Sequence, residues 1–147
     1  MKVNNAGIQL IKTFEGCLLN AYLCPAKVWT IGYGSTRYLN GTPIKQGDKI
    51  TQQEAETLLS DTLNEFSHNV LKLIKTELND NQFSALVSFS FNLGINALAK
   101  STLLKKVNVN PNDKTIEQEF GKWVNAGGQK LSGLVRRRNA ESKLYFS

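Results

Sequence analysis

Three side chains in a short stretch near the start of the chain could take part in chemistry: Glu15, Cys24 and Thr30. Glu15 follows Ile8 and Ile11 at helical spacing, so we expect it at the end of an amphipathic helix, on the face turned toward the core. A carboxyl group on an apolar face suits a general acid, because burial favours its protonated form. The competing interpretation is a helix-terminal Glu that simply reaches solvent.

Two local elements would have to position these side chains. The apolar spacing predicts a helix over residues 4–15, and Gly16 is a natural C-terminal stop for it. Val28, Thr30 and Tyr33 favour strands, so we expect a β-hairpin directly after the helix. Taken alone, Thr30 would be an ordinary strand residue.

The rest of the chain has mainly helical periodicity. A capping box, Thr51-Gln-Gln-Glu54, predicts the start of a long helix that continues for over six turns. Asn79 or Asp80 can cap the helix after it, and the Gly127-Gly128 pair should break the chain. The remaining helices are expected over residues 98–107, 115–124 and 133–146.

The composition is that of a soluble globular protein, with 147 residues, 41% of them hydrophobic and 20% charged. The net charge of +6 suits a polyanionic partner, and because no nucleic-acid-binding motif is present we expect no nucleic acid. No apolar run predicts stable membrane insertion, and no secretory signal is recognisable, so a whole natural chain would start in the cytoplasm. Two Cys and one His make a metal site implausible.

Residues 14–36 resemble the active-site region of the bacteriophage lysozymes, the muramidase endolysins of glycoside hydrolase family 24. The family pattern is a helix-ending Glu-Gly, an acidic residue nine positions after the Glu, and a Thr fifteen positions after it. Glu15 and Thr30 match this pattern in type and spacing, whereas Cys24 stands at the acidic position. Similarity to the family therefore comes with one chemically important departure.

Two further motifs extend the resemblance to nearly the whole chain. Residues 79–94 meet the pattern Asn-x-x-Gln-x-x-Ala-Leu-x-Ser-Phe-x-Phe-Asn-x-Gly, and residues 133–141 meet Gly-Leu-x-x-Arg-Arg-x-x-Glu. All three motifs occur in the family's order, so the chain is identified from its sequence as a member of this family.

The resemblance implies that Glu15 is the acid, that Thr30 helps to hold the attacking water, and that Cys24 replaces the base or electrostatic stabiliser. Three interpretations of Cys24 stay open. Its thiolate is catalytic; or it pairs with Cys17 in a regulatory disulfide, as in similar lysozymes that use thiol–disulfide exchange; or both cysteines are inert and Glu15 works with Thr30 alone.

The resemblance also implies that an Arg of the last helix, for which we choose Arg137, orients Glu15. The alternative is a solvated face on which Arg137 pairs with Glu141 four residues later. By motif position, the expected substrate-binding residues are Gly34, Thr36, Phe91, Thr102 and Gln129. Phe91 could equally be a core residue.

The implied fold is a single lysozyme-like α+β domain over residues 1–147. Its parts are a hairpin lobe over about residues 16–50, a connecting helix over about 51–76, and a helical lobe over about 77–147 on which residues 1–15 pack. The implied function is hydrolysis of the β-1,4 bond between N-acetylmuramic acid and N-acetylglucosamine in peptidoglycan, without a cofactor, to lyse a bacterial host.

Two other functions stay open: a lytic transglycosylase acting on the same bond, and a basic antibacterial protein that acts on walls or membranes without cutting. Peptidoglycan is the expected partner and a monomer the expected state. The protein would leave the host cytoplasm with the help of a holin or similar protein and act in the periplasm.

Overall fold

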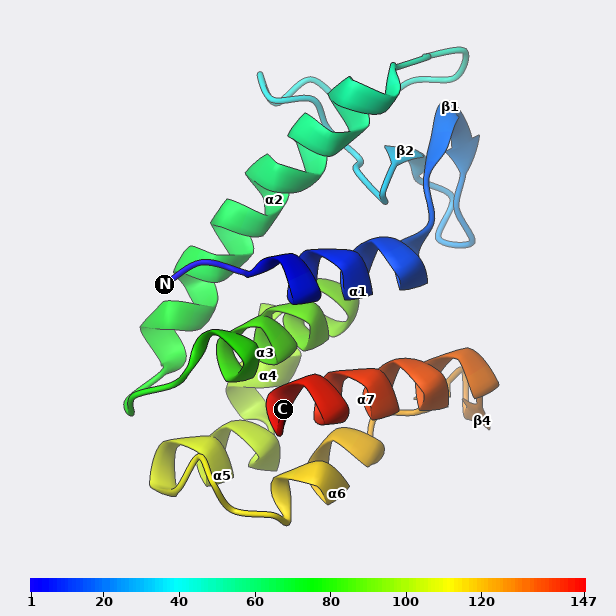
Figure 1. The fold of residues 1–147 in the computed structure, drawn as a ribbon. Coiled ribbons are helices and arrows are strands. Elements are labelled where there is room, and N and C mark those ends of the chain that lie inside the picture. Colours follow the sequence, from blue (N-terminus) through cyan, green and yellow to red (C-terminus); the bar gives the residue numbers. More distant parts are fainter. The chain divides into compact units, whose positions relative to one another are not determined.

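The computed structural model describes residues 1–147, which form two compact units (Figure 1). The first, here called the helical unit, comprises residues 1–10 and 66–147, and the second, the hairpin unit, comprises residues 11–65. Two helices cross the division between the units, α1 (Asn5–Glu15) and α2 (Gln52–Leu73).

The hairpin unit contains the predicted hairpin as an antiparallel pair, β1 (Leu18–Leu23) and β2 (Trp29–Gly32). The register places Tyr22 opposite Thr30 and Leu23 opposite Trp29, with an irregularity nearer the start of β1. The interior of this unit is aliphatic, and its buried side chains include Ile11, Ile31, Ile44, Ile50, Leu58, Leu59 and Leu63.

The predicted capping box starts α2. The Thr51 hydroxyl accepts from the Glu54 N–H at 3.1 Å, and the Glu54 carboxylate accepts from the Thr51 N–H at 3.0 Å. At the other end the Asn108 side chain donates to the carbonyl of the last helical residue at 3.0 Å and accepts from the Lys75 N–H at 2.8 Å. The helix therefore ends at residue 73, a few residues before the expected position.

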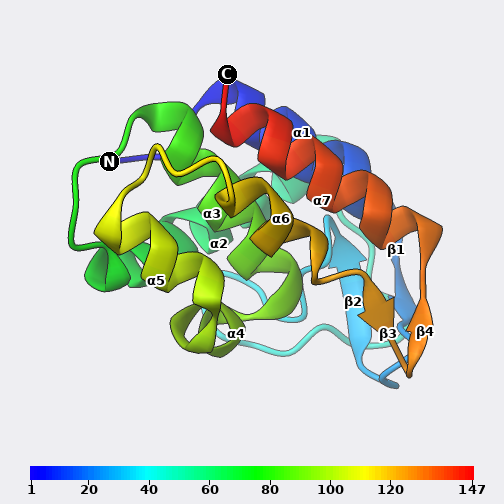
Figure 2. The same cartoon turned by 90° about the horizontal axis from the view of Figure 1, so that it is seen from below.

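The helical unit is built around α3 (Asp80–Leu93), in which residues 82–90 are all buried. The predicted cap at Asn79 is confirmed, because Asn79 and Gln82 form a reciprocal capping box. Helix α7 (Ser132–Tyr145) packs on α3, and α6 (Ile116–Gly121) packs on α7 (Figure 2). Edge-to-face rings of Phe89, Phe120 and Tyr145 fill the space among these helices.

Residues near both ends of the sequence meet on α3. The Asn4 amide donates to Asn81 Oδ1 at 2.7 Å, and the Asn81 amide donates to Ser147 Oγ at 3.0 Å. The Ser84 hydroxyl accepts from the Asn4 N–H at 3.0 Å. Gly7 permits this close approach, since a methyl group there would lie 2.6 Å from the Ser84 Cβ.

The single helix predicted over residues 98–107 is wrong. The chain forms two helices instead, α4 (Ile95–Lys100) and α5 (Thr102–Val109), separated by Ser101. The Ser101 hydroxyl donates to the Leu98 carbonyl at 2.7 Å and accepts from the Leu104 N–H at 3.0 Å. Because this side chain offers the backbone alternative partners, it ends one helix and caps the next.

The break predicted at Gly127-Gly128 is a turn of a second small hairpin, formed by β3 (Asn125–Ala126) and β4 (Gln129–Lys130). Both glycines have positive φ, 59° and 79°, as a two-residue hairpin turn requires. Helix α6 ends at residue 121 rather than at 124, so the residues leading into this hairpin are not helical.

The α+β class is thus confirmed, with two short antiparallel hairpins beside seven helices. Formal charge is divided unevenly between the units. The helical unit has 13 Lys and Arg against 6 Asp and Glu, or +7, whereas the hairpin unit has 5 against 6, or −1. None of the helices is long and apolar enough to cross a membrane.

Candidate active site

Glu15 is the last residue of α1, as the sequence predicts, and its side chain is half-buried. Gly16 ends the helix with φ of 68°, and its N–H still donates to the Lys12 carbonyl at 3.0 Å. A turn between Ile31 and Ser35 runs beside Glu15, because a Cβ added to Gly34 would lie 3.7 Å from Glu15 Oε1. Gly34 thus leaves space in front of the carboxyl group.

A polar network joins the end of α1 to the start of α2. Glu56 pairs with Lys12 and accepts from the Gln52 amide at 3.2 Å, and the same amide donates to the Tyr33 hydroxyl at 3.0 Å. The Cys17 thiol contacts Gln52 Oε1 at 3.7 Å. These contacts hold the segment between Glu15 and β1 against α2.

Three side chains of the hairpin share one face. Tyr22 lies directly opposite Thr30 in the strand register, and Cys24 follows Tyr22 by two residues, so strand alternation directs all three to the same side. A tight turn fixes Cys24, whose N–H donates to the Val28 carbonyl at 3.0 Å while its carbonyl accepts from Lys27 at 2.7 Å. The sequence-predicted Cys24 and Thr30 are therefore brought together.

The surroundings of Cys24 favour its thiolate. The pKa of the Cys24 thiol is lowered, mainly because the Val28 N–H can hydrogen-bond the sulfur, with smaller help from the Ala26 N–H and the Thr30 hydroxyl. Burial acts in the opposite direction. A thiolate carries a negative charge, and this environment stabilises that charge at the hairpin turn.

The Thr30 side chain is buried, with 4% of its surface exposed, and its hydroxyl donates to the Val28 carbonyl at 3.0 Å. Because the hydroxyl has one proton, it serves either this carbonyl or the Cys24 sulfur at any one time. While it donates to Val28, its oxygen lone pairs can accept a hydrogen bond from a water molecule.

Tyr22 is a site residue that the sequence reasoning missed. Burial, followed by the nearby charges of Cys24 and Glu15, raises the pKa of the Tyr22 phenol. The phenol therefore stays protonated beside two acidic groups and can donate a hydrogen bond to either anion or to a substrate. Its place two residues before Cys24 in a strand was the available signal.

Cys17 and Cys24 are free thiols in the structure, and both are half-buried. Cys17 precedes β1 and contacts α2, whereas Cys24 follows β1 at the hairpin turn. The structure thus represents the unpaired form, and a regulatory disulfide between them stays a prediction. No group of three or more His, Cys, Asp or Glu side chains could hold a metal ion.

Arg137 belongs to a buried ionic cluster in the helical unit. Its guanidinium donates to Glu141 at 3.3 Å and to the Ser88 carbonyl at 3.3 Å, while Arg138 Nε lies 3.0 Å from the other Glu141 oxygen. The alternative of a solvated face is therefore wrong for Arg137 and Arg138, although the Arg137–Glu141 pair exists. Arg136 is exposed.

The other predicted substrate-binding residues occupy both units. Phe91 is half-buried, and its ring lies 5.4 Å from that of Phe66, so part of the ring serves packing. Thr102 begins α5 and Gln129 begins β4, and both are exposed. In the hairpin unit, Gly34 and Thr36 are exposed. It stays a prediction that four residues of the helical unit lie near the hairpin residues: Arg137, Phe91, Thr102 and Gln129.

The structure thus places a helix-ending Glu in the same unit as a hairpin that presents Thr30 and a thiol of lowered pKa, the arrangement expected of a lysozyme-like glycosidase. The family model described as "Phage lysozyme" matches residues 12–141, and the chain belongs to this family.

Curated endolysins are similar to this protein over the whole of its chain. An endolysin of Acyrthosiphon pisum secondary endosymbiont phage 1 is 41% identical, with 100% of this chain and 99% of the relative covered. An endolysin of Bacillus phage B103 is also 41% identical over 100% of this chain, but the chain spans only 55% of that relative. Some relatives therefore carry a second region that this sequence does not match.

Solved structures of endolysins are also similar to this chain. The endolysin from Escherichia coli O157:H7 phage FAHEc1 matches with a TM-score of 0.90 and 37% identity, covering 100% of this chain and 94% of that one. The P1 phage endolysin Lyz is known in two forms, both 27% identical to this chain over 99% of its length. The active form matches with a TM-score of 0.83 over 85% of its chain, and the secreted inactive form with 0.62 over 96%.

Proposed function

We propose that the protein is a phage endolysin that hydrolyses the β-1,4 bond between N-acetylmuramic acid and N-acetylglucosamine in bacterial peptidoglycan. Membership of the phage lysozyme family and the endolysin relatives support peptidoglycan hydrolysis. The observation that supports the site is the hairpin face on which Cys24, with its lowered pKa, lies beside Thr30.

In the proposed reaction Glu15 gives its proton to the glycosidic oxygen as the carbon–oxygen bond breaks. The sugar carbon gains oxocarbenium character, which the negative Cys24 sulfur stabilises. A water molecule that donates to Thr30 Oγ attacks this carbon and passes a proton to the thiolate. Hydrolysis then balances when that proton returns to Glu15 through solvent.

The experiment that tests the proposal is clearance of purified peptidoglycan by the wild type, Glu15→Gln, Cys24→Ser and Cys24→Asp. We expect Glu15→Gln and Cys24→Ser to lose about 10²- to 10⁴-fold in rate, the usual contribution of an acid–base group. Cys24→Asp should restore most of the activity. Full activity of Cys24→Ser would overturn the role of the thiol and leave Glu15 working with Thr30 alone.

We also propose that a Cys17–Cys24 disulfide is an inactive form of this enzyme. A disulfide removes the thiolate and ties the hairpin turn to the segment after Glu15. Support comes from the two forms of the P1 endolysin, since this chain with free thiols matches the active form better. Reductant should activate oxidised wild type but have no effect on Cys17→Ser, whose Cys24 has no partner within the chain.

A lytic transglycosylase is the second candidate. The thiol at the usual carboxylate position favours it, because that chemistry can proceed with a single acid and without an attacking water. Mass spectrometry of the released sugars separates the two reactions, since a transglycosylase leaves an anhydro sugar and a hydrolase leaves a reducing end.

A basic antibacterial protein that does not cut is a candidate of another class, supported by the +7 charge of the helical unit. Bacterial killing that survives Glu15→Gln would favour it. We further propose that the enzyme is a monomer, that it stays in the host cytoplasm until a holin or similar protein releases it, and that it then acts on the wall from the periplasm.

A further inference from the structure

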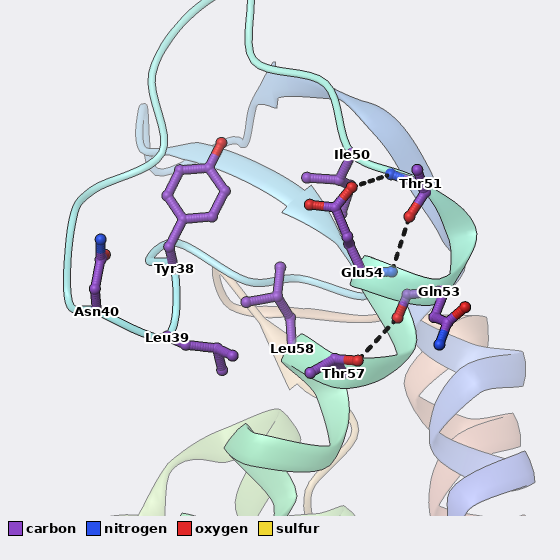
Figure 3. Close-up of a pocket in the computed structure, with 9 residues that line it drawn as sticks. All are labelled: Tyr38, Leu39, Asn40, Ile50, Thr51, Gln53, Glu54, Thr57 and Leu58. Atoms are coloured by element: carbon purple, nitrogen blue, oxygen red, sulfur yellow. Dashed lines mark hydrogen bonds between the residues drawn. The ribbon is translucent and has the colours of Figure 1, made fainter.

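The hairpin unit has a cavity that does not include Glu15, Cys24 or Thr30 (Figure 3). It has a volume of about 680 Å³ and lies between the Asn40-Gly41 turn and the first turns of α2. Leu39 from the turn, together with Ile50 and Leu58, gives it an apolar surface. Leu39 is 57% exposed, so much of its side chain is accessible to a ligand.

Polar groups on the cavity wall have free hydrogen-bonding capacity. Asn40 Oδ1 accepts from the Thr42 N–H at 2.9 Å, which leaves its NH₂ group without a partner in the chain. The Gln53 side chain makes no hydrogen bond within the chain. Glu54 uses one carboxylate oxygen to accept from the Thr51 N–H at 3.0 Å, and its other oxygen can accept from a ligand. Donors and acceptors thus border an apolar surface.

The hollow continues along α2. A second cavity of about 420 Å³ shares Leu39, Gln53 and Thr57 with the first and extends to Asp61 and Asn64. Residues 53, 57, 61 and 64 follow at spacings of four, four and three, so they form one stripe on the helix. At ~1.5 Å per residue the stripe is roughly 16 Å long, a length suited to a short oligosaccharide.

The charge of this groove is negative. Glu54 and Asp61 are exposed and form no ion pair, whereas Glu56 forms one with Lys12. No Lys or Arg lines either cavity. A ligand segment bearing carboxylates would therefore be repelled, whereas neutral hydroxyl and acetamido groups can donate to the carboxylates. Amide, hydroxyl and carboxylate groups beside an apolar surface are the chemistry with which proteins bind sugars.

We infer that this groove is a second glycan-binding site, which takes the uncharged N-acetylglucosamine units of the polymer whose bond is cut at Glu15. The inference rests on the proposed function for the identity of the polymer. The groove adds a contact that a long glycan can use and a short one cannot.

The test is an NMR titration of ¹⁵N-labelled Glu15→Gln protein, which does not cut its ligand, with a β-1,4-linked N-acetylglucosamine oligomer. We expect amide shift changes at residues 38–40 and 53–57. The double variant Leu39→Ser, Gln53→Ala in the same background should raise the Kd for this group of signals by about three- to tenfold, the effect of one hydrogen bond and some apolar contact. Gln118→Ala on α6, the matched control, should leave it unchanged.

Several outcomes would overturn the inference: no shift changes in the groove, an equal Kd in the double variant, or tighter binding of an anionic oligogalacturonate. Peptidoglycan clearance by the wild type is measured beside the titration. Clearance without binding in the groove contradicts only this inference, and binding without clearance contradicts only the proposed hydrolase.

Discussion

Tyr22 and Thr30 face each other across the β1–β2 hairpin, and Cys24 follows on the same face two residues after Tyr22. The negative charges of Cys24 and Glu15 help to raise the pKa of Tyr22, after burial. A protonated phenol therefore lies near the two groups that the proposed reaction uses as acid and as anion. Such a donor stabilises an anion next to it without carrying a charge itself.

Tyr22→Phe should therefore lower kcat by about tenfold, the effect expected when an anion formed in the reaction loses a nearby hydrogen-bond donor. The pH–rate profile separates a positioning role from a structural one. A phenol that donates to the Cys24 thiolate stabilises it, so the acid limb of the profile should move to higher pH in the variant. A lower kcat with an unmoved acid limb would contradict this role.

Cys24→Asp should shift the acid limb of the pH–rate profile to lower pH. The reference pKa of a thiol is ~8.5 and that of an aspartate ~3.9, and because the pKa of Cys24 is already lowered, the shift should be smaller than the difference between these two values. Rates of peptidoglycan clearance between pH 4 and 9, an assay window of about five units, measure it. Coincident profiles would mean that the side chain at position 24 does not titrate in the reaction.

Gly34→Ala should reduce activity more than stability alone explains. Gly34 has φ of 96°, so a side chain is strained there by about 1–2 kcal/mol, and the new methyl group would lie 3.7 Å from Glu15 Oε1. Gly47→Ala is the matched control, because Gly47 has φ of 87° and nothing within 4 Å of an added Cβ. Urea denaturation should show a similar decrease in the free energy of unfolding for both variants. Only Gly34→Ala should also have a lower kcat.

Glu141→Gln should destabilise the protein by roughly 3–5 kcal/mol, the typical cost of breaking a buried ionic cluster. Two buried guanidinium groups, those of Arg137 and Arg138, would then lose the carboxylate they share. Urea unfolding measures the loss, and Glu117→Gln, at an exposed position on α6, should change stability little. Equal urea midpoints of unfolding for Glu141→Gln and Glu117→Gln would show that the cluster does not stabilise the fold.

The Tyr38–Asp48 hydrogen bond, 2.7 Å long, should make the hairpin unit sensitive to acid. The Lys45 N–H and then Tyr38 lower the pKa of Asp48, and burial followed by Asp48 raises the pKa of Tyr38 to about 12. Because the folded-state pKa of Asp48 is lowered, its stabilisation is complete above its unfolded pKa and is lost as pH falls through the folded value.

Carboxyl NMR titration of Asp48 in the wild type and in Tyr38→Phe checks this. The pKa of Asp48 should rise in the variant but stay below the usual value, because the Lys45 N–H still donates at 2.9 Å. An unchanged titration would show that the phenol contributes nothing to the ionised form.

The capping boxes, the hairpin and the family were predictable from the sequence because each depends on a few residues close together. The division of a helix at Ser101 was not, since a serine is tolerated inside helices and only the competing bonds to Leu98 and Leu104 decide the outcome. Burial of Arg137 and Arg138 was equally hidden, because three successive arginines suggest a solvated face until Ser88 and Glu141 supply partners.

At the candidate site, residue types indicated Glu15, Cys24 and Thr30, whereas the only sequence signal for Tyr22 was its strand position two residues before Cys24, which the register then places opposite Thr30. The surroundings that lower the Cys24 pKa come mainly from backbone N–H groups of the turn, which carry no signature in side-chain identity. The groove beside Asn40 and Gln53 also depends on the path of a loop over a helix.

The bonds from Asn81 to Asn4 and to Ser147 have a consequence for synthesis on the ribosome. The hairpin unit is continuous in sequence, so all of its residues are available once residue 65 has emerged. The helical unit needs its first residues and its last helix together, so it can close only when translation is nearly complete. In a nascent chain Glu15, Cys24 and Thr30 would therefore be present, with every other residue of their unit, long before the helical unit can close.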